Sequence, residues 1–278
     1  MSALKNKNLN SRTIGVFDSG LGGLSVLRAL FEKLPNYSYF YLGDTARVPY
    51  GDRSPETIFE YTIAAVEFLF KRGCQLVIIA CNTASSQALR RLQQEWLIKN
   101  YPNRRVLGVI RPLVEAVAAS NKNHLGIIGT TATINSQAYS QELKILKPNL
   151  KIEVKATPLL VPLIEEGRLD TPETRLILED YLKPLKTAGI DSLVLACTHY
   201  PYLQNLIKEL LGPEVLIYNS GEIIADSLAL YLKRHPELNL EAKNPEHRFY
   251  VSDAPASFAA QGEKFLGQPL KNLELVNL

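Results

Sequence analysis

Two of the three cysteines in the chain occupy matched positions. Cys81 follows the apolar run Leu76–Ala80, and Cys197 follows the apolar run Leu193–Ala196. Polar residues and an expected helix follow each cysteine, and the N-terminus of a helix favours a thiolate over a thiol. An unperturbed thiol has a pKa of about 8.5, so it can both take and give a proton near neutral pH. Two opposed thiols are therefore suited to inverting the α-carbon of an amino acid, which must lose a proton from one face and gain one on the other.

Other chemistry is less well supported by the cysteines and histidines. Cys74 lies in a turn before the first apolar run and has no counterpart, so a structural role is expected for it. Metal binding is not expected, because CxxC and HxxxH pairs are absent and the histidines are scattered. The four histidines are His124, His199, His235 and His247. A hydrolase that used Cys197 and His199 would leave Cys81 without a role.

A glycine cluster follows the first expected strand and resembles a dinucleotide-binding turn. Gly20 and Gly22 fit the first two glycines of such a motif, and Asp44 ends the next strand. However, Ser25 stands where the third glycine belongs, and Asp18 places a carboxylate where a pyrophosphate would lie. We therefore expect a tight turn that directs Asp18 toward the site, and we do not expect a nicotinamide cofactor.

Short apolar runs alternate with longer amphipathic stretches, which predicts a parallel α/β fold with helices on both faces of the sheets. The runs expected to form strands are 14–17, 39–42, 76–80, 106–109, 125–128, 152–156, 193–196, 215–218 and 248–252.

The two halves of the chain repeat the same order of features. Gly15 precedes Cys81 by 66 positions and Gly126 precedes Cys197 by 71, and a Pro-Asn pair precedes the second strand of each half. Any two βαβ units can share a glycine and a proline, but the common order favours an internal duplication. It predicts two similar doubly wound domains related by a pseudo-twofold axis. Each would place one cysteine at the carboxyl end of a strand, beside a cleft between the domains.

The segment after Gly212-Pro213 has no counterpart between the repeats. We expect it to pack back onto the first half, which makes the first domain discontinuous. The predicted domains are residues 1–105 with 217–278, and residues 106–216.

The composition argues against several classes of protein. The chain has 278 residues with 31 basic and 28 acidic side chains, a net charge of +3 and no basic stripe, so nucleic-acid binding is not expected. No run approaches the about 20 apolar residues of a membrane span. Residues 1–13 lack the apolar core of a signal peptide and are expected to be a loose start. With an odd number of cysteines, a cytoplasmic protein with reduced thiols is expected.

Five short strings together resemble glutamate racemases of the aspartate/glutamate racemase superfamily. They are GVFDSGLGG at 15–23, PYG at 49–51, ACNTAS at 80–85, LVPLIEEG at 160–167 and ACTHYP at 196–201. The resemblance covers nearly the whole chain, and ACTHYP is more similar to the glutamate branch than to aspartate racemases.

This resemblance implies an isomerase without a cofactor or metal, in which Cys81 and Cys197 are the two proton donors and acceptors. It implies that Asp18 assists Cys81, and that His199 and Glu165 assist Cys197; Glu166 is adjacent and only the alignment chooses between the two. The implied substrate-binding residues are Asp18, Ser19, Tyr50, Gly51, Asn82, Thr83, Thr198 and His199. A homodimer that supplies D-glutamate for peptidoglycan is also implied.

Three alternatives remain at this stage. The same chemistry could act on aspartate or a related acid, a two-domain protein could close on a small acid without turnover, and a nicotinamide oxidoreductase would require bound dinucleotide.

Overall fold

A computed structural model describes residues 12–278 of the chain. The start of the chain was expected to be loose over residues 1–13, and residues 1–11 of this stretch lie outside the described residues. Thr13 is not loose, because it is buried and is the first residue of strand β1.

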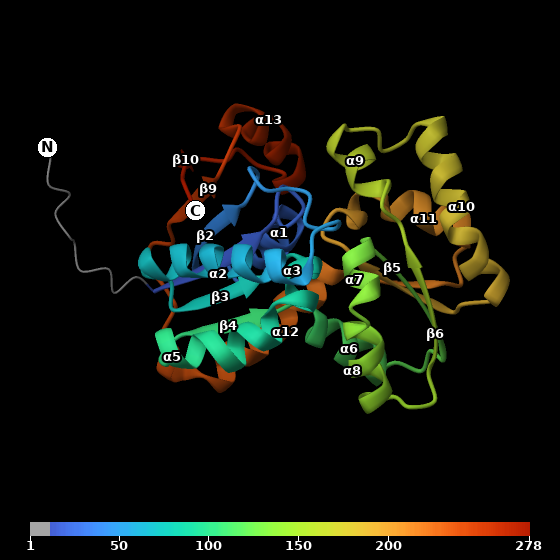
Figure 1. Ribbon diagram of the computed structural model, residues 1–278, viewed down its shortest axis with the longest axis horizontal. Helices are drawn as coiled ribbons and strands as arrows, with labels where there is room; N and C mark the ends of the chain where they lie inside the picture. The colour runs from blue at the N-terminus through green and yellow to red at the C-terminus, as the bar shows by residue number, and fades with distance from the viewer. Residues whose placement is uncertain (1–11) are drawn as a thin grey trace, which may run out of the picture.

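The first sheet has six parallel strands in the order β10-β9-β2-β1-β3-β4. Its strands are β1 Thr13–Asp18, β2 Ser38–Gly43, β3 Leu76–Ile79, β4 Arg105–Gly108, β9 His247–Val251 and β10 Leu273–Leu275. The C-terminal strands, drawn in red in Figure 1, lie beside the blue β2, which joins the end of the chain to its first half.

The second sheet has four parallel strands in the order β6-β5-β7-β8. Its strands are β5 His124–Gly129, β6 Lys151–Ala156, β7 Ser192–Ala196 and β8 Leu216–Tyr218. In chain order this sheet runs second, first, third, fourth, as does the stretch β2-β1-β3-β4 of the first sheet. The duplicated arrangement predicted from the sequence is therefore present in the strand order.

Helices cover both faces of each sheet (Figure 1). Around the first sheet they are α1 Leu24–Lys33, α2 Pro55–Lys71, α3 Asn82–Gln87, α4 Leu89–Arg91, a π-helical segment Leu92–Leu97, α5 Ile98–Asn100, α12 Ser220–Arg234, a 3-10 turn Pro236–Leu238 and α13 Pro255–Leu266. Around the second they are α6 Ile110–Ala119, α7 Thr131–Asn135, α8 Ala138–Leu146, α9 Leu160–Glu165, α10 Pro172–Ala188, a 3-10 helix Tyr200–Leu203 and α11 Gln204–Leu211.

The long helices α2 and α10 hold equivalent places in the two halves. Each has 17 residues, each has proline at its first position, and each is capped by the hydroxyl of the preceding residue. Ser54 caps α2 and Thr171 caps α10, and both accept a hydrogen bond from the backbone N–H three residues later.

Glycine in the first strand of each half lets a helix approach the sheet closely. A Cβ built on Gly15 would lie 3.0 Å from Leu69 Cδ1 of α2, and one on Gly126 would lie 2.7 Å from Ile190 Cδ1 after α10. These repeated glycines therefore fix the depth at which the covering helix packs in both halves.

The chain passes from one sheet to the other close to the domain boundaries predicted from the sequence. β4, at residues 105–108, pairs with β3 in the first sheet, and β8, at residues 216–218, pairs with β7 in the second. The sheet pairing thus shifts each predicted boundary by two or three residues. We propose the division 12–108 with 219–278, and 109–218; the folding of these parts as independent domains stays a prediction.

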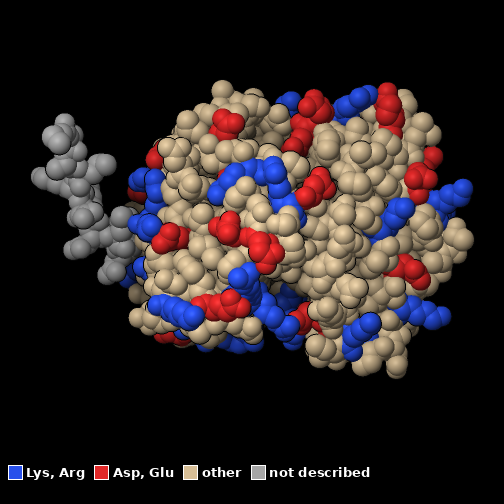
Figure 2. Space-filling view, viewed as in Figure 1, with Lys and Arg blue, Asp and Glu red and all other residues tan. Residues whose placement is uncertain are grey.

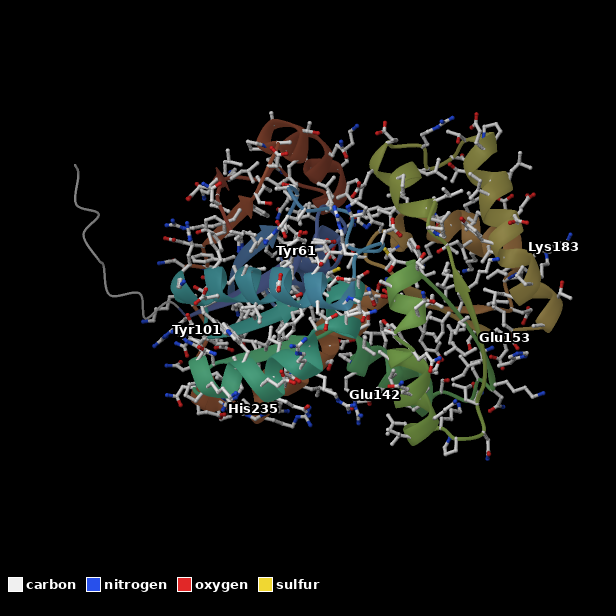
Figure 3. All side chains as sticks on the ribbon, in the orientation of Figure 1. Tyr61, Tyr101, Glu142, Glu153, Lys183 and His235 are labelled. Atoms are coloured by element: carbon white, nitrogen blue, oxygen red, sulfur yellow. The ribbon has the colours of Figure 1, made fainter. Side chains whose placement is uncertain are left out.

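The surface carries both signs of charge. On the face shown in Figure 2, basic and acidic residues are interspersed. Several form ion pairs between helices, including Glu142 of α8, labelled in Figure 3, which lies 2.9 Å from Arg111 of α6. No helix in the described part of the chain is long and apolar enough to cross a bilayer.

Candidate active site

Cys81 lies between β3 and α3 and is itself the N-cap of that helix. Its Sγ accepts a hydrogen bond from the backbone N–H of Ala84 and lies 3.5 Å from the hydroxyl of Ser19. The sequence suggested the polar side chains of residues 82–85 as caps, but these begin the helix and the thiol caps it. The sulfur is thus held at the carboxyl end of the first sheet.

Asp18 ends the neighbouring strand β1 and is fully buried. Its Oδ2 accepts a hydrogen bond from Gly20 N–H at 3.0 Å, and its Oδ1 accepts one from the Thr198 hydroxyl at 3.3 Å. The amide of the tight turn is therefore occupied by the protein's own carboxylate, as expected if this turn does not bind a pyrophosphate. Burial raises the pKa of Asp18, against the opposing influence of the positive charge of His199.

Burial also raises the pKa of Cys81, to about 12, and the nearby Asp18 charge adds to this effect. The expectation that a helix N-terminus would favour the thiolate is therefore wrong for Cys81, because the loss of solvation outweighs the Ala84 N–H bond and the helix dipole. At neutral pH Cys81 is therefore a thiol, which is the proton-donating form.

Cys197 follows β7 and belongs to a different environment. Its Sγ lies 3.8 Å from Nδ1 of His199, and Nε2 of the same ring lies 2.9 Å from Oε1 of Glu165. Burial opposes the charged imidazolium, but the hydrogen bonds to Cys197 and Glu165 outweigh it and raise the pKa of His199 to about 10. The adjacent Glu166 is exposed, so the structure brings Glu165 and not Glu166 to the histidine.

The helix expected directly after Cys197 begins later. A turn at residues 197–199 and the 3-10 helix Tyr200–Leu203 precede α11, which ends at Leu211 with Gly212 as its C-cap, as predicted. Cys197 is therefore not at an α-helix N-terminus, and its charged neighbour is an imidazole ring.

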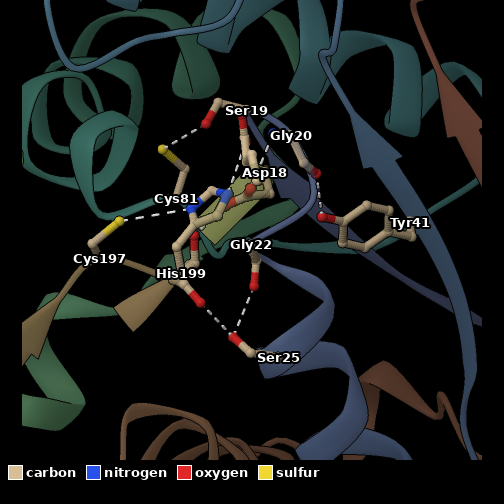
Figure 4. A network of polar contacts seen from close by, with 11 residues as sticks. Asp18, Ser19, Gly20, Gly22, Ser25, Tyr41, Cys81, Cys197 and His199 are labelled. Atoms are coloured by element: carbon tan, nitrogen blue, oxygen red, sulfur yellow. Dashed lines mark hydrogen bonds and ion pairs between the residues drawn. The ribbon is translucent and has the colours of Figure 1, made fainter. Parts of the chain in front are cut away.

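The start of α1 packs against the Cys197 turn and joins the two halves (Figure 4). The Ser25 hydroxyl donates to the carbonyl of Thr198 at 2.9 Å. A Cβ on Gly22 would lie 2.3 Å from Thr198 Oγ1 and 2.5 Å from His199 Nδ1, so only glycine allows this approach. Figure 4 shows the resulting arrangement, with Cys81 and Cys197 converging on the same space from different elements.

Tyr50 and Gly51 lie in the loop between β2 and α2. The Tyr50 side chain is buried and its hydroxyl donates to Asp44 Oδ2 at 2.5 Å, while Arg47 Nε donates to the same oxygen at 2.6 Å. The Gly51 carbonyl accepts a hydrogen bond from Ala132 of α7. The tyrosine ring thus anchors the loop, and the Gly51 backbone contacts the second half.

Asn82 and Thr83 follow Cys81 and contact the second half directly. The Thr83 hydroxyl lies 2.9 Å from that of Thr130 and 3.3 Å from that of Thr133, and Asn82 Oδ1 accepts a hydrogen bond from the Tyr139 hydroxyl at 2.5 Å. Sequence reasoning missed these three partners. The duplication contained a signal for Thr130, because it follows the end of β5 as Ser19 follows the end of β1.

The structure brings together Cys81, Asp18, Ser19, Cys197, Thr198, His199 and Glu165 in one connected network, with Asn82 and Thr83 beside it. Within residues 12–278, no group of three or more His, Cys, Asp or Glu side chains is placed to hold a metal ion.

Cys74 lies away from this network, fully buried before β3, and burial raises its pKa to about 12. Cys74→Ala should leave turnover within about twofold while costing on the order of 1 kcal/mol of stability through lost packing. In the unfolded chain the pKa of the thiol is about 8.5. Its contribution to stability is therefore complete below that pH and is lost as the pH rises toward 12. Urea midpoints at pH 8 and pH 10.5 should therefore differ less in the variant than in the unsubstituted protein. A tenfold loss of turnover would contradict a structural role.

Comparisons with known proteins agree with this geometry. Residues 14–228 match the pattern of the family described as Asp/Glu/Hydantoin racemase. The chain is 46% identical over 266 residues to a glutamate racemase of Syntrophus aciditrophicus, covering 95% of this chain and 96% of the relative. It is 44% identical over 268 residues to one of Neisseria meningitidis serogroup A, covering 96% and 97%. A crystal structure of the Francisella tularensis glutamate racemase, in complex with D-glutamate, has a TM-score of 0.87 at 36% identity and covers 96% of this chain and 98% of that one. The chain therefore belongs to the Asp/Glu/Hydantoin racemase family, in which these relatives are glutamate racemases.

Proposed function

We propose that this chain is a glutamate racemase that interconverts L- and D-glutamate by proton transfer between two cysteines, without a cofactor. One observation carries the proposal: buried thiols stand at the carboxyl ends of the third strand of each half, β3 and β7, and converge on one site. A single small base would have to move to serve both faces of the α-carbon. Two fixed thiols do not.

In the proposed reaction, the thiolate of one cysteine takes the proton from the α-carbon, and the C–H electron pair remains on the substrate as a carbanion. The thiol of the other cysteine then gives its proton to the opposite face and becomes the thiolate. The next substrate of opposite handedness reverses these roles. No electrons leave the substrate, so neither an oxidant nor a reductant is required.

Each cysteine has its own assistants. Asp18 has a raised pKa and lies close enough to Cys81 for its charge to raise the pKa of the thiol, so we assign it the exchange of a proton with Cys81. His199, held as imidazolium by Cys197 and Glu165, stabilises the Cys197 thiolate. We therefore assign catalytic roles to Cys81, Cys197, Asp18, His199 and Glu165.

The substrate's charged groups need hydrogen-bond partners on both sides of the α-carbon. The hydroxyls of Ser19 and Thr83 and the amide of Asn82 can donate to carboxylates, and the backbone of Tyr50 and Gly51 offers further N–H groups. The Thr198 hydroxyl donates to Asp18, so its oxygen can accept from the substrate's ammonium group. Asp18 and His199 complete the proposed substrate-binding set. The contacts of Thr83 with Thr130 and Thr133 support adding these two residues to it.

The alternative substrate is aspartate, which has one methylene fewer and needs the same two thiols. The names of the relatives favour glutamate. Assays of the purified protein with L-glutamate and L-aspartate separate the two, and a higher kcat/KM with aspartate would replace glutamate in the proposal.

Incubation with L-glutamate in D2O tests the mechanism as well as the activity. Early in the reaction, the D-glutamate formed should carry deuterium at its α-carbon while the remaining L-glutamate keeps protium, because the proton is removed by one cysteine and replaced by the other. Chiral chromatography with mass spectrometry measures both. If glutamate binds but no α-deuterium enters either enantiomer, the protein is a binding protein and not a racemase.

We also propose a cytoplasmic homodimer that supplies D-glutamate for peptidoglycan. The chemistry and the relatives support this role, and light scattering of the purified protein measures the oligomeric state.

A further inference from the structure

One hydrogen bond to the candidate site comes from a residue that the proposed mechanism does not use. Tyr139 lies in α8, which covers the second sheet, and its hydroxyl donates to Oδ1 of Asn82 at 2.5 Å. Asn82 begins α3, directly after Cys81, so this bond connects the second half of the molecule to the residue beside the first thiol.

The tyrosine is firmly held. Its ring is buried in the same apolar cluster as Leu113, Leu143 and Val194, and only 3% of the residue is exposed. Burial raises the pKa of Tyr139 far above its usual range, so the hydroxyl keeps its proton and remains a donor at any working pH.

A donated proton at Oδ1 determines which way the Asn82 amide faces. The amide has an acceptor oxygen and a donor NH2 group, and rotation of the group by half a turn exchanges them. With Oδ1 bound to Tyr139, Nδ2 is directed elsewhere. Among the described residues it has no hydrogen-bond partner and is not a fully buried unpaired atom, so it remains open to a ligand.

We infer that Tyr139 is a positioning residue, which fixes the Asn82 amide so that its NH2 group donates to a carboxylate of the substrate. The inference rests on the proposed function, because it assigns Asn82 to substrate binding. A carboxylate only accepts hydrogen bonds, so an amide free to turn its oxygen toward the site would bind it less well. Tyr139 thereby acts on affinity through Asn82, and it does not touch the reacting atoms.

Tyr139→Phe removes the hydroxyl and keeps the ring. We expect KM for both L- and D-glutamate to rise about tenfold, the effect of losing one well-placed hydrogen bond, with kcat changed less than threefold. Tyr218→Phe is the matched control. Tyr218 belongs to the same apolar cluster, and its hydroxyl donates to Ser120 at 2.8 Å, away from the site. This control should leave KM unchanged.

A double variant separates positioning from general support of the fold. If Tyr139 acts through Asn82, then adding Tyr139→Phe to Asn82→Ala should change KM by less than twofold, whereas independent effects would multiply. Asn82→Asp gives a second measure that leaves Tyr139 intact, because its carboxylate accepts from the tyrosine but offers no donor; KM should rise at least tenfold.

An unchanged KM in Tyr139→Phe, multiplying effects in the double variant, or a normal KM in Asn82→Asp would each overturn the inference while leaving the racemase proposal in place. Absence of turnover in the unsubstituted protein would remove the proposed function itself, and this inference with it.

Discussion

Serine in place of Cys81 or of Cys197 is expected to lower glutamate racemisation by about 10²–10⁴-fold, the range that a positioned general acid or base contributes. A hydroxyl is a far weaker acid than a thiol, so serine neither forms the base nor gives up a proton readily. Each direction of the reaction needs one thiolate and one thiol, and therefore each substitution should stop both directions. Circular dichroism of the reaction mixture follows racemisation directly.

The two variants should nevertheless differ in a residual reaction. In each, the remaining cysteine still faces the α-hydrogen of one enantiomer and can exchange it with solvent deuterium without inversion. Slow exchange should thus be confined to one enantiomer in Cys81→Ser and to the other in Cys197→Ser. Cys74→Ala, which also removes a buried thiol, should racemise normally. Near-normal turnover by either serine variant would rule out the two-thiol mechanism.

Removal of the imidazole beside Cys197 is the second large effect that we expect. His199→Gln should lower kcat/KM by about 10²-fold or more, because the Cys197 thiolate loses its charged partner. The imidazolium has a pKa of about 10, so it is charged at neutral pH and is lost as pH rises through that value. In the unsubstituted protein kcat/KM should therefore decline above about pH 10. In the variant this decline should be absent, because glutamine carries no charge that a rise in pH could remove.

The two adjacent glutamates supply a matched pair for this test. Glu165→Gln keeps a hydrogen-bond acceptor for His199 but removes the charge that helps to raise its pKa, so the alkaline decline should move to lower pH with an intermediate loss of activity. Glu166→Gln, at an exposed neighbour, should reproduce the unsubstituted pH profile. If Glu166→Gln caused the larger shift, the assignment of Glu165 would be wrong.

Much of the fold could be predicted from the sequence because buried parallel strands appear as continuous apolar runs. β1 and β7 are examples, and all nine runs expected to be strands occur as strands within a few residues. β10 was missed, since Leu273–Leu275 is a short and mostly exposed edge. The sheet to which β4 belongs was not predicted either: it pairs with β3, the strand before it, but its apolar run does not show whether the next strand along the chain joins the same sheet.

The site was predictable in its residues but less so in its physics. Adjacent side chains at the end of α9 point in different directions, so the docking of the helix decides between Glu165 and Glu166. Pro201 is compatible with the start of an α-helix or a 3-10 helix, and the sequence could not distinguish them. The state of Cys81 was predicted from its helix alone, whereas the pKa of a thiol also depends on the burial that the whole fold imposes.

The two cysteines have unlike surroundings, but thermodynamics limits the effect that this asymmetry can have in the proposed enzyme. L- and D-glutamate have equal free energy in water, so detailed balance requires the same kcat/KM for both, although Asp18 stands at one thiol and His199 with Glu165 at the other. Any preference that this asymmetry creates must therefore cancel: an enantiomer that has the lower KM must have a lower kcat by the same factor. The protein can therefore bind one enantiomer more tightly than the other, but the final mixture must contain equal amounts of both.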